Sequence, residues 1–274
     1  MWGKTNRKEV KIMGLKEIAR MVNEHNREKD LAEEFGLYFN EAIVRIYQER
    51  NRGRKPSRNY KPSSLGGCLR NNYFQLIGAD LDKENNSTVT GIGMAESGTD
   101  RHKRLQDVIV RMEGLGYPIK WVDIDDYLKS NPVPGTVMVS KNGYEYKLKN
   151  DIYKISFLSD GVIKIRNKIY SIIEIKTEAS FKWRDRISPE ENHIVQAACY
   201  SLCLGIDNVI FIYENRDFCN KKYFLYKVTE EDKQGIIDII ETCNNYVREN
   251  VAPPKTDNKR NCTYCQYKEI CKIY

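Results

Sequence analysis

Apolar residues recur every three or four positions in four stretches of the chain, which is the spacing of one helical face. The first stretch spans residues 15–49 and the last spans 229–249. A third follows Met94 and places four side chains on one face: His102, Leu105, Ile109 and Met112. The fourth, 188–205, opens with a capping-box pattern at Ser188, with proline at the first helical position. We therefore expect a long helix in each stretch.

Between the expected helix after Met94 and the expected helix at 188–205, apolar residues alternate with polar ones or run together, and many are β-branched. Such stretches are typical of strands, and the short turns between them favour an antiparallel set. They occupy residues 144–149, 152–158, 161–165 and 169–176. Two more strands are expected at 208–214 and 222–228. The order helix, three or four strands, helix, strands, helix predicts an α/β core with a mixed sheet.

The segment 50–64 is rich in Arg, Lys, Pro and Ser, so we expect a linker or mobile loop. Placing the boundary near Lys61 divides the chain into an N-terminal helical segment, 1–61, and a main domain, 62–274. No run of about 18 apolar residues exists and the N-terminus lacks an apolar signal core, which predicts a cytoplasmic protein without a membrane span. The formal charge of +7 weakly favours a polyanionic partner.

Three places in the predicted core carry polar residues that a core does not need. Glu174 and Lys176, in "IIEIKT", face the same way along their strand and are costly to bury unless they pair or bind a metal. Asp160, in "FLSDG", ends an earlier strand. Gln196 and Tyr200 are four apart on one helical face. Taken singly, each fits an ordinary buried pair, a solvent-facing residue or a packed side chain.

His102 adds a fourth feature, since Gly98 precedes it in "GTDRH". A lone histidine on an apolar face is more often a satisfied core residue than a ligand. The four features nevertheless follow one another as G-x-x-x-H, D-G, E-x-K-T and Q-x-x-x-Y over the predicted helix, strands and helix. Their conjunction carries more weight than any one of them.

In this order of motifs the chain resembles the RecB family of the PD-(D/E)XK nuclease superfamily, and most of all its CRISPR-associated and phage exonucleases that carry an iron–sulfur cluster. The resemblance covers residues 62 to the C-terminus. It implies a restriction-endonuclease-like core, in which helices flank a mixed central sheet and an iron–sulfur clasp closes the domain. The helical segment 1–61 has no counterpart in the minimal family core, and its role stays open.

The resemblance also implies roles for the polar residues. The implied ligands of Mg²⁺ or Mn²⁺ are three side chains and one backbone carbonyl: His102, Asp160, Glu174 and Ile175. Lys176 would orient or deprotonate the attacking water, and Gln196 and Tyr200 would steady the lysine or the substrate phosphate. Independently of the family, two carboxylates, a carbonyl and water form a hard-oxygen site that suits Mg²⁺ or Mn²⁺, and one imidazole favours Mn²⁺. Phosphodiester hydrolysis needs the activated water and charge relief that such a cation supplies.

Eight cysteines in a reducing cytosol are expected to be thiols, and clustered ones more often bind metal than form disulfides. The family's arrangement, one cysteine before the core and C-x2-C-x5-C after it, matches Cys68, Cys262, Cys265 and Cys271. In relatives these hold a [4Fe–4S] cluster; four thiolates also suit zinc, which stays an alternative. The remaining four are expected to pack as small apolar residues: Cys199, Cys203, Cys219 and Cys243.

Two segments combine positive charge with aromatic or flexible character. One is 50–61, which is equally an ordinary solvated linker. The other, "FKWRDR", follows Lys176 closely and supplies the candidate nucleic-acid-binding residues Lys182, Trp183, Arg184 and Arg186, with Trp183 or Phe181 able to stack on an unpaired base. An ordinary loop is the alternative there. The acidic stretch "WVDIDDY", 121–127, is expected to be a solvated turn rather than a second metal site.

We therefore expect a metal-dependent deoxyribonuclease, an exonuclease on single-stranded or frayed DNA ends. It would act in recombination, replication or end processing in a bacterial or phage-infected cell, beside a helicase, recombinase or other replication protein. The rival is a catalytically silent nuclease-like module that grips DNA or a helicase partner. Cleavage polarity, exonuclease against endonuclease action, DNA against RNA preference and oligomeric state all stay open.

Overall fold

The computed structural model describes residues 15–53, 57–82, 88–258, 260–263 and 265–273. It contains two compact units. The first comprises the chain up to Gly53 together with Ser87–Gly93, and the second comprises Arg54–Asn86 and Met94–Tyr274. Among the described residues, none of the helices has both the length and the apolar composition that a bilayer crossing requires.

The first unit consists mainly of the predicted N-terminal helix, α1 (Leu15–Asn51). Ion pairs one turn apart support it along its surface, for example Arg20 Nε to Glu24 Oε1 at 2.8 Å. The rings of Phe35 and Phe39 stack one turn apart, with 5.6 Å between their centroids. The helix therefore has local sources of stability along its length.

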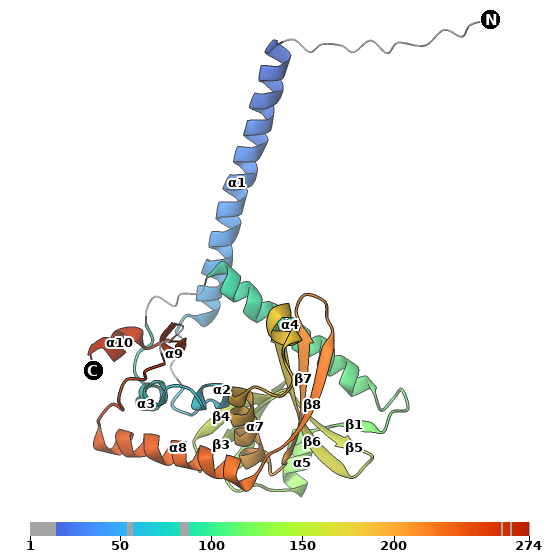
Figure 1. Cartoon of the computed structure of the whole chain (residues 1–274), viewed down its shortest axis with the longest axis vertical. Helices are drawn as coiled ribbons and strands as arrows, with labels where there is room; N and C mark the ends of the chain where they lie inside the picture. The colour runs from blue at the N-terminus through green and yellow to red at the C-terminus, as the bar shows by residue number, and fades with distance from the viewer. Residues whose placement is uncertain (1–14, 54–56, 83–87, 259, 264, 274) are drawn as a thin grey trace, which may run out of the picture. The chain divides into compact units, whose positions relative to one another are not determined.

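The second unit is built on a mixed five-stranded sheet in the order β1-β5-β6-β7-β8 (Figure 1). The central pair, β6 and β7, is parallel, and the other three pairs are antiparallel. The strands are β1 (Ile119–Val122), β5 (Val162–Ile165), β6 (Ile169–Glu178), β7 (Asn208–Asn215) and β8 (Lys221–Lys227). This confirms the predicted α/β class with a mixed central sheet.

A second sheet of three antiparallel strands has the order β2-β3-β4. Its strands are β2 (Thr136–Asn142), β3 (Glu145–Asn150) and β4 (Ile155–Ser159). The four stretches expected to form one antiparallel set between 144 and 176 are therefore divided between two sheets. The division falls at Asp160 and Gly161, where the chain leaves β4 and enters β5.

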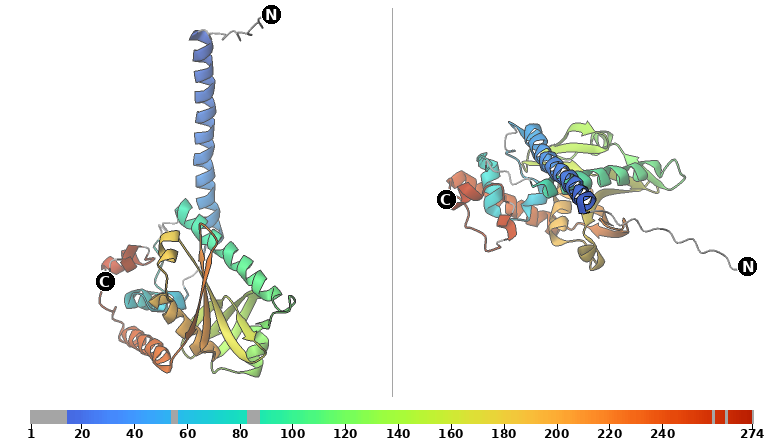
Figure 2. Two further views of the ribbon diagram at one scale, coloured as in Figure 1. Left: turned by 45° about the vertical axis from the view of Figure 1, so that its right-hand side comes forward. Right: turned by 90° about the horizontal axis from the view of Figure 1, so that it is seen from above.

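Helices cover both faces of the five-stranded sheet (Figure 2). On one face, Ile173 and Ile175 of β6 pack with Leu105 and Ile109 of α4 (Val89–Arg111). On the other face, alternate strand residues pack in the main core with α7 (Glu191–Leu204). The remaining helices of this unit are α2 (Pro62–Leu65), α3 (Leu69–Ile77), α5 (Ile124–Ser130), α6 (Ser180–Arg184), α8 (Glu230–Glu249), α9 (Arg260–Thr263) and α10 (Lys268–Ile273).

The structure corrects two local predictions. The capping box expected at Ser188 is wrong, since α7 starts at Glu191 and its N-cap, Glu190, makes no side-chain cap bond. The Ser188 carbonyl instead accepts a hydrogen bond from Arg186. The acidic stretch after Trp121 is also more than a solvated turn, because Asp123 caps α5 by accepting two backbone N–H bonds.

The C-terminal helices α9 and α10 lie beside α3 in both views (Figure 1, Figure 2). Asp82, which follows α3, accepts the backbone N–H groups of Lys268 and Glu269 at the start of α10. On the N-terminal side the core reaches Tyr60, which is 1% exposed and donates to the Ile240 carbonyl of α8. Both ends of this unit are thus tied to its helical layer.

Candidate active site

The passage from β4 to β5 places Asp160 beside the middle of β6. Strand β5 pairs with β6 only as far as Val162 opposite Ile172, and the Gly161 carbonyl then accepts the Ile173 N–H. The next amide on the same edge of β6, that of Ile175, donates instead to Asp160 Oδ2 at 2.8 Å. The end of the ladder is therefore completed by a side chain.

Glycine is needed directly after this aspartate. Gly161 has φ +145°, a conformation that residues with a side chain rarely adopt. A Cβ atom there would also collide with the ring of Trp121. The D-G pair therefore combines a ligand-type side chain with the one residue that lets the chain change sheets at this point.

Glu174 and Lys176 lie on the α7 side of β6, as their alternation predicts. The Lys176 ammonium is 2.5 Å from Glu174 Oε1 and donates to Gln196 Oε1 of α7 at 2.8 Å. The other oxygen, Glu174 Oε2, is buried and has no hydrogen-bond partner among the described residues. The Glu174 carboxylate is thus only half satisfied, at a residue that is 2% exposed.

Gln196 continues a hydrogen-bonded chain away from the lysine. Its amide nitrogen donates to the hydroxyl of Tyr200, which in turn reaches the Leu158 carbonyl of β4 at 3.5 Å. The Tyr200 ring also stacks on Phe157, with 4.6 Å between centroids. The helix spacing Q-x-x-x-Y therefore fixes the orientation of the Gln196 oxygen that Lys176 uses.

His102 reaches the same place from α4. Its Nδ1 lies 3.0 Å from Asp160 Oδ1, and Gln106, one turn later, donates to the Asp160 carbonyl at 2.8 Å. Burial disfavours the protonated imidazole, but the hydrogen bond and charge of Asp160 outweigh it and raise the pKa of His102. The structure therefore brings together all six predicted catalytic and ligand side chains: His102, Asp160, Glu174, Lys176, Gln196 and Tyr200.

The side chains suit a divalent cation by their chemistry and by the unbonded Glu174 oxygen, but not by their present arrangement. Burial raises the pKa of Glu174 to about 7, an effect that the Lys176 charge only partly offsets. An additional positive charge at Oε2 would satisfy that oxygen and favour the ionised carboxylate. The other candidate ligand side chains are bound to each other, since His102 contacts Asp160. In the described ranges no group of three or more His, Cys, Asp or Glu side chains is arranged as a metal site.

The four predicted cluster cysteines lie at the junction of α3 with the C-terminal helices. Cys68 precedes α3 as its N-cap residue, and the Asn71 amide, one turn into α3, donates to Cys265 Sγ at 3.4 Å. Cys262 is exposed, and Cys265 and Cys271 are half-buried. Within the described part of the chain these thiols do not form a metal-binding group, so the iron–sulfur cluster stays a prediction.

The predicted nucleic-acid residues after β6 fall into two classes. Trp183 donates its indole N–H to the Tyr213 carbonyl at 3.0 Å and carries the Lys222 ammonium over its ring. Arg186 is bound by Glu178 and Glu190, and its side chain is 12% exposed. Both are therefore held by the protein itself. Lys182 and Arg184 keep exposed side chains, though each contacts a neighbouring carboxylate.

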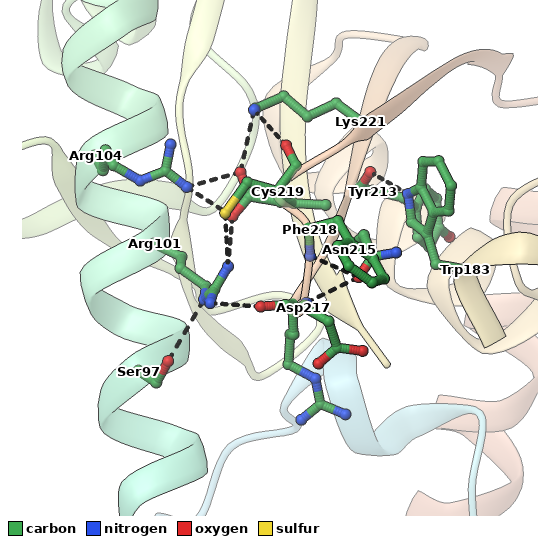
Figure 3. Close-up of polar contacts among 12 residues, drawn as sticks. Ser97, Arg101, Arg104, Trp183, Tyr213, Asn215, Asp217, Phe218, Cys219 and Lys221 are labelled. Atoms are coloured by element: carbon green, nitrogen blue, oxygen red, sulfur yellow. Dashed lines mark hydrogen bonds and ion pairs between the residues drawn. The ribbon is translucent and has the colours of Figure 1, made fainter. Parts of the chain in front are cut away.

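A second glutamate buried in the sheet, Glu214, was not predicted from the sequence pattern. Glu214, near the end of β7, receives hydrogen bonds from Arg101 at 2.9 Å and Arg104 at 2.6 Å, and an ion pair from Lys221 at 3.3 Å (Figure 3). Burial disfavours its ionisation, but Arg104 and Arg101 outweigh it and lower the pKa of Glu214. Its two arginine partners precede it by more than 100 residues, so no local sequence pattern predicts the cluster.

No protein-family model matches this sequence, and no curated protein does either. The fold is similar to the crystal structure of SSO0001, with a TM-score of 0.50 and 18% identity, covering 86% of this chain and 97% of that one. An alkaline exonuclease, LHK-Exo, from Laribacter hongkongensis gives a TM-score of 0.43 at 11% identity, covering 71% and 90% of the two chains. Its complex with dAMP gives 0.43 at 10%, covering 80% and 96%. At these identities the likeness concerns the fold alone.

Proposed function

We propose that this chain is a metal-dependent deoxyribonuclease that hydrolyses phosphodiester bonds, acting as an exonuclease on single-stranded or frayed ends. The observation that carries the proposal is the convergence of His102, Asp160 and Glu174 from three elements beside Lys176, with Glu174 Oε2 buried and unbonded in the described structure. A structural Glu–Lys pair alone would not require an imidazole and a second carboxylate at its side.

His102, Asp160, Glu174 and the Ile175 carbonyl would hold Mg²⁺ or Mn²⁺. When bound, the cation would supply charge stabilisation on the phosphate and an acidified water. Lys176 directs two of its three N–H donors to Glu174 and Gln196, which leaves one for a phosphate oxygen or the attacking water. Attack of the water oxygen on phosphorus breaks one P–O bond, so holding that water in line is the contribution expected of Lys176.

The test is cleavage of end-labelled single- and double-stranded DNA with Mn²⁺ or Mg²⁺, for the wild-type chain and for Asp160→Asn and Lys176→Ala. Both substitutions should abolish cleavage while thermal unfolding stays cooperative. Labelling either end also reports polarity, and an RNA strand reports sugar preference. Retained cleavage by a cleanly purified Lys176→Ala protein would contradict the mechanism. A wild-type chain that binds DNA without cutting it would instead identify the silent DNA-binding or helicase-partner module.

We further propose that Cys68, Cys262, Cys265 and Cys271 bind a [4Fe–4S] cluster that fastens the C-terminus to α3. The support is the thiol set and the contact between Cys265 and Asn71. Iron and sulfide content of anaerobically purified protein, with its visible absorption, tests this directly. Zinc without iron or sulfide would replace the cluster by a structural zinc site and leave the nuclease proposal untouched.

A further inference from the structure

A cleft of about 240 Å³ opens beside Lys176, where β6 ends. Its walls come from the end of β6, from α6, from the start of α7 and from the turn after β7. The charged side chains that line it, together with one imidazole, are Lys176, Glu178, Lys182, Glu190, Arg216 and His193. One wall is therefore the lysine of the candidate active site, and the cleft extends away from it.

The cleft is lined by more cations than carboxylates: Lys176, Lys182 and Arg216 face Glu178 and Glu190. Arg186 contacts both Glu178, at 2.5 Å, and Glu190, at 3.0 Å, and Lys182 contacts Glu190 at 3.2 Å. The Arg216 side chain makes no hydrogen bond or ion pair with the parts of the chain that the structure describes. Its backbone is fixed, since the Arg216 N–H donates to the Glu178 carbonyl at 2.8 Å.

The turn that carries Arg216 is also fixed from the other side. Arg101 of α4 donates to the Arg216 carbonyl at 2.8 Å while it binds the buried Glu214 (Figure 3). Asn215 accepts the backbone N–H groups of Asp217 and Phe218, which closes the turn. A guanidinium that makes no hydrogen bond to the described residues, although the Asp217 carboxylate is nearby, is thus presented from a backbone fixed by hydrogen bonds, which lowers the entropic cost of binding an anion.

His193 supplies the cleft with a neutral donor. Its Nδ1 lies 2.7 Å from the Tyr213 hydroxyl, and that hydroxyl oxygen accepts the Glu190 N–H at 3.1 Å. Among the described residues the Tyr213 hydroxyl has no other acceptor for its proton, so that proton is directed to Nδ1 and the imidazole proton is left on Nε2. Burial and the Lys176 charge lower the pKa of His193 to about 3, so the ring stays neutral at physiological pH.

We propose that this cleft binds a phosphate group of the DNA strand next to the bond being cleaved, with Nε2–H of His193 as a neutral donor and Lys182 and Arg216 supplying charge. The proposal rests on the nuclease function proposed above. It places the strand along the line from Lys176 to Arg216, and not across Trp183 and Arg186, which the protein binds internally. A neutral donor adds a directed hydrogen bond without a further cation beside Lys176.

The salt dependence of DNA binding distinguishes the proposed charged contacts of Lys182 and Arg216 from the proposed neutral hydrogen bond of His193. Binding of a fluorescent single-stranded oligonucleotide to the full chain is measured by anisotropy in EDTA, over a series of NaCl concentrations. Lys182→Gln and Arg216→Gln should each reduce the slope of log affinity against log salt by about 0.7, since each removes one phosphate contact. Lys129→Gln, which removes an exposed charge from α5, is the matched control and should leave the slope unchanged.

His193→Phe keeps a ring beside Tyr213 but loses the donor, so affinity should fall roughly tenfold at an unchanged salt slope. His193→Gln restores an N–H donor and should recover most of that loss. Wild-type affinity in His193→Phe, or equal losses in the Phe and Gln variants with unchanged unfolding midpoints, would overturn the proposal. If the wild-type chain binds in this pattern but does not cleave after Mn²⁺ is added, the nuclease function fails and the phosphate cleft stands.

Discussion

Two buried glutamates on neighbouring strands of one sheet are treated in opposite ways. Glu214 on β7 is 0% exposed and is contacted by Arg101, Arg104 and Lys221. Glu174 on β6 is 2% exposed and receives only Lys176, so that one of its oxygens is buried without a partner among the described residues. The Glu214 carboxylate is therefore surrounded by three cationic side chains, whereas the Glu174 carboxylate has one cationic partner and one oxygen without a hydrogen bond in the described structure.

The register shows how near these two environments are. Glu174 pairs with Phe211 and Thr177 pairs with Glu214, so the two carboxylates are only three residues apart along the β6–β7 ladder. Glu214 is bound by arginines of α4, whereas Glu174 contacts Lys176 of its own strand, which in turn donates to Gln196 of α7. Glu214 shows that this sheet can neutralise a buried carboxylate, and the unsaturated Glu174 is where the proposed cation would bind, at a cost in stability while no cation is bound.

The largest expected effect is on activity at the unsaturated carboxylate. Glu174→Gln should abolish Mn²⁺-dependent cleavage, because the amide removes the negative charge that would hold the cation. The metal-free variant should be at least as stable as the wild type, since a half-satisfied buried charge has been neutralised. Cleavage assays and thermal unfolding in EDTA measure both. A strongly destabilised Glu174→Gln protein would show that this glutamate is structural, like Glu214.

Glu214→Gln is the matched substitution on the adjacent strand. It should lower the free energy of unfolding by about 3 kcal/mol, at the low end of the cost of breaking a buried pair because Arg104 and Lys221 are partly exposed. Denaturant unfolding measures the change. The opposite result, a stable Glu214→Gln protein that has lost cleavage, would move the cation site to β7.

The sequence predicted the fold class, and it predicted the relative placement of two pairs of candidate site residues from local geometry. The alternation along β6 placed Glu174 and Lys176 on one face, and the four-residue spacing on α7 aligned Gln196 with Tyr200; both follow from local geometry. The Glu214 cluster was not predictable in this way, because its arginines lie on a helix and its glutamate on a strand more than 100 residues later. Long-range charge pairing leaves no periodic signal.

The misread elements have physical reasons of their own. β1 is only four residues long, too short for an alternating pattern to stand out. The capping box at Ser188 is absent because Arg186 binds the Ser188 carbonyl and the Glu190 N–H is bound by the Tyr213 hydroxyl, which moves the helix start to Glu191. Tertiary contacts thus override a local signal where the chain borders the cleft.

The pH dependence of stability should differ in sign between the two glutamates. The folded-state pKa of Glu214 is lowered, so its stabilisation is complete above the ordinary value of 4.5 and is lost as the pH falls further. That of Glu174 is raised to about 7 by burial, so its destabilisation is absent below 4.5 and grows as the pH rises to about 7. In EDTA, Glu174→Gln should therefore gain stability relative to wild type between pH 5 and 7. A constant difference over that range would contradict the burial argument.

The smallest effect is expected at the far end of the hydrogen-bonded chain that orients Lys176. Tyr200→Phe keeps the ring stacked on Phe157 but removes the hydroxyl that fixes the Gln196 amide. The Gln196 oxygen can then rotate away from Lys176, which should lower kcat roughly tenfold, the scale of lost supporting contacts at metal sites. KM and the unfolding midpoint should change little, and Gln196→Glu, which keeps an oxygen toward Lys176, should not add to the Tyr200→Phe loss. A Tyr200→Phe protein with wild-type kcat would mean that Glu174 alone positions the lysine, and the chain through α7 would then serve packing only.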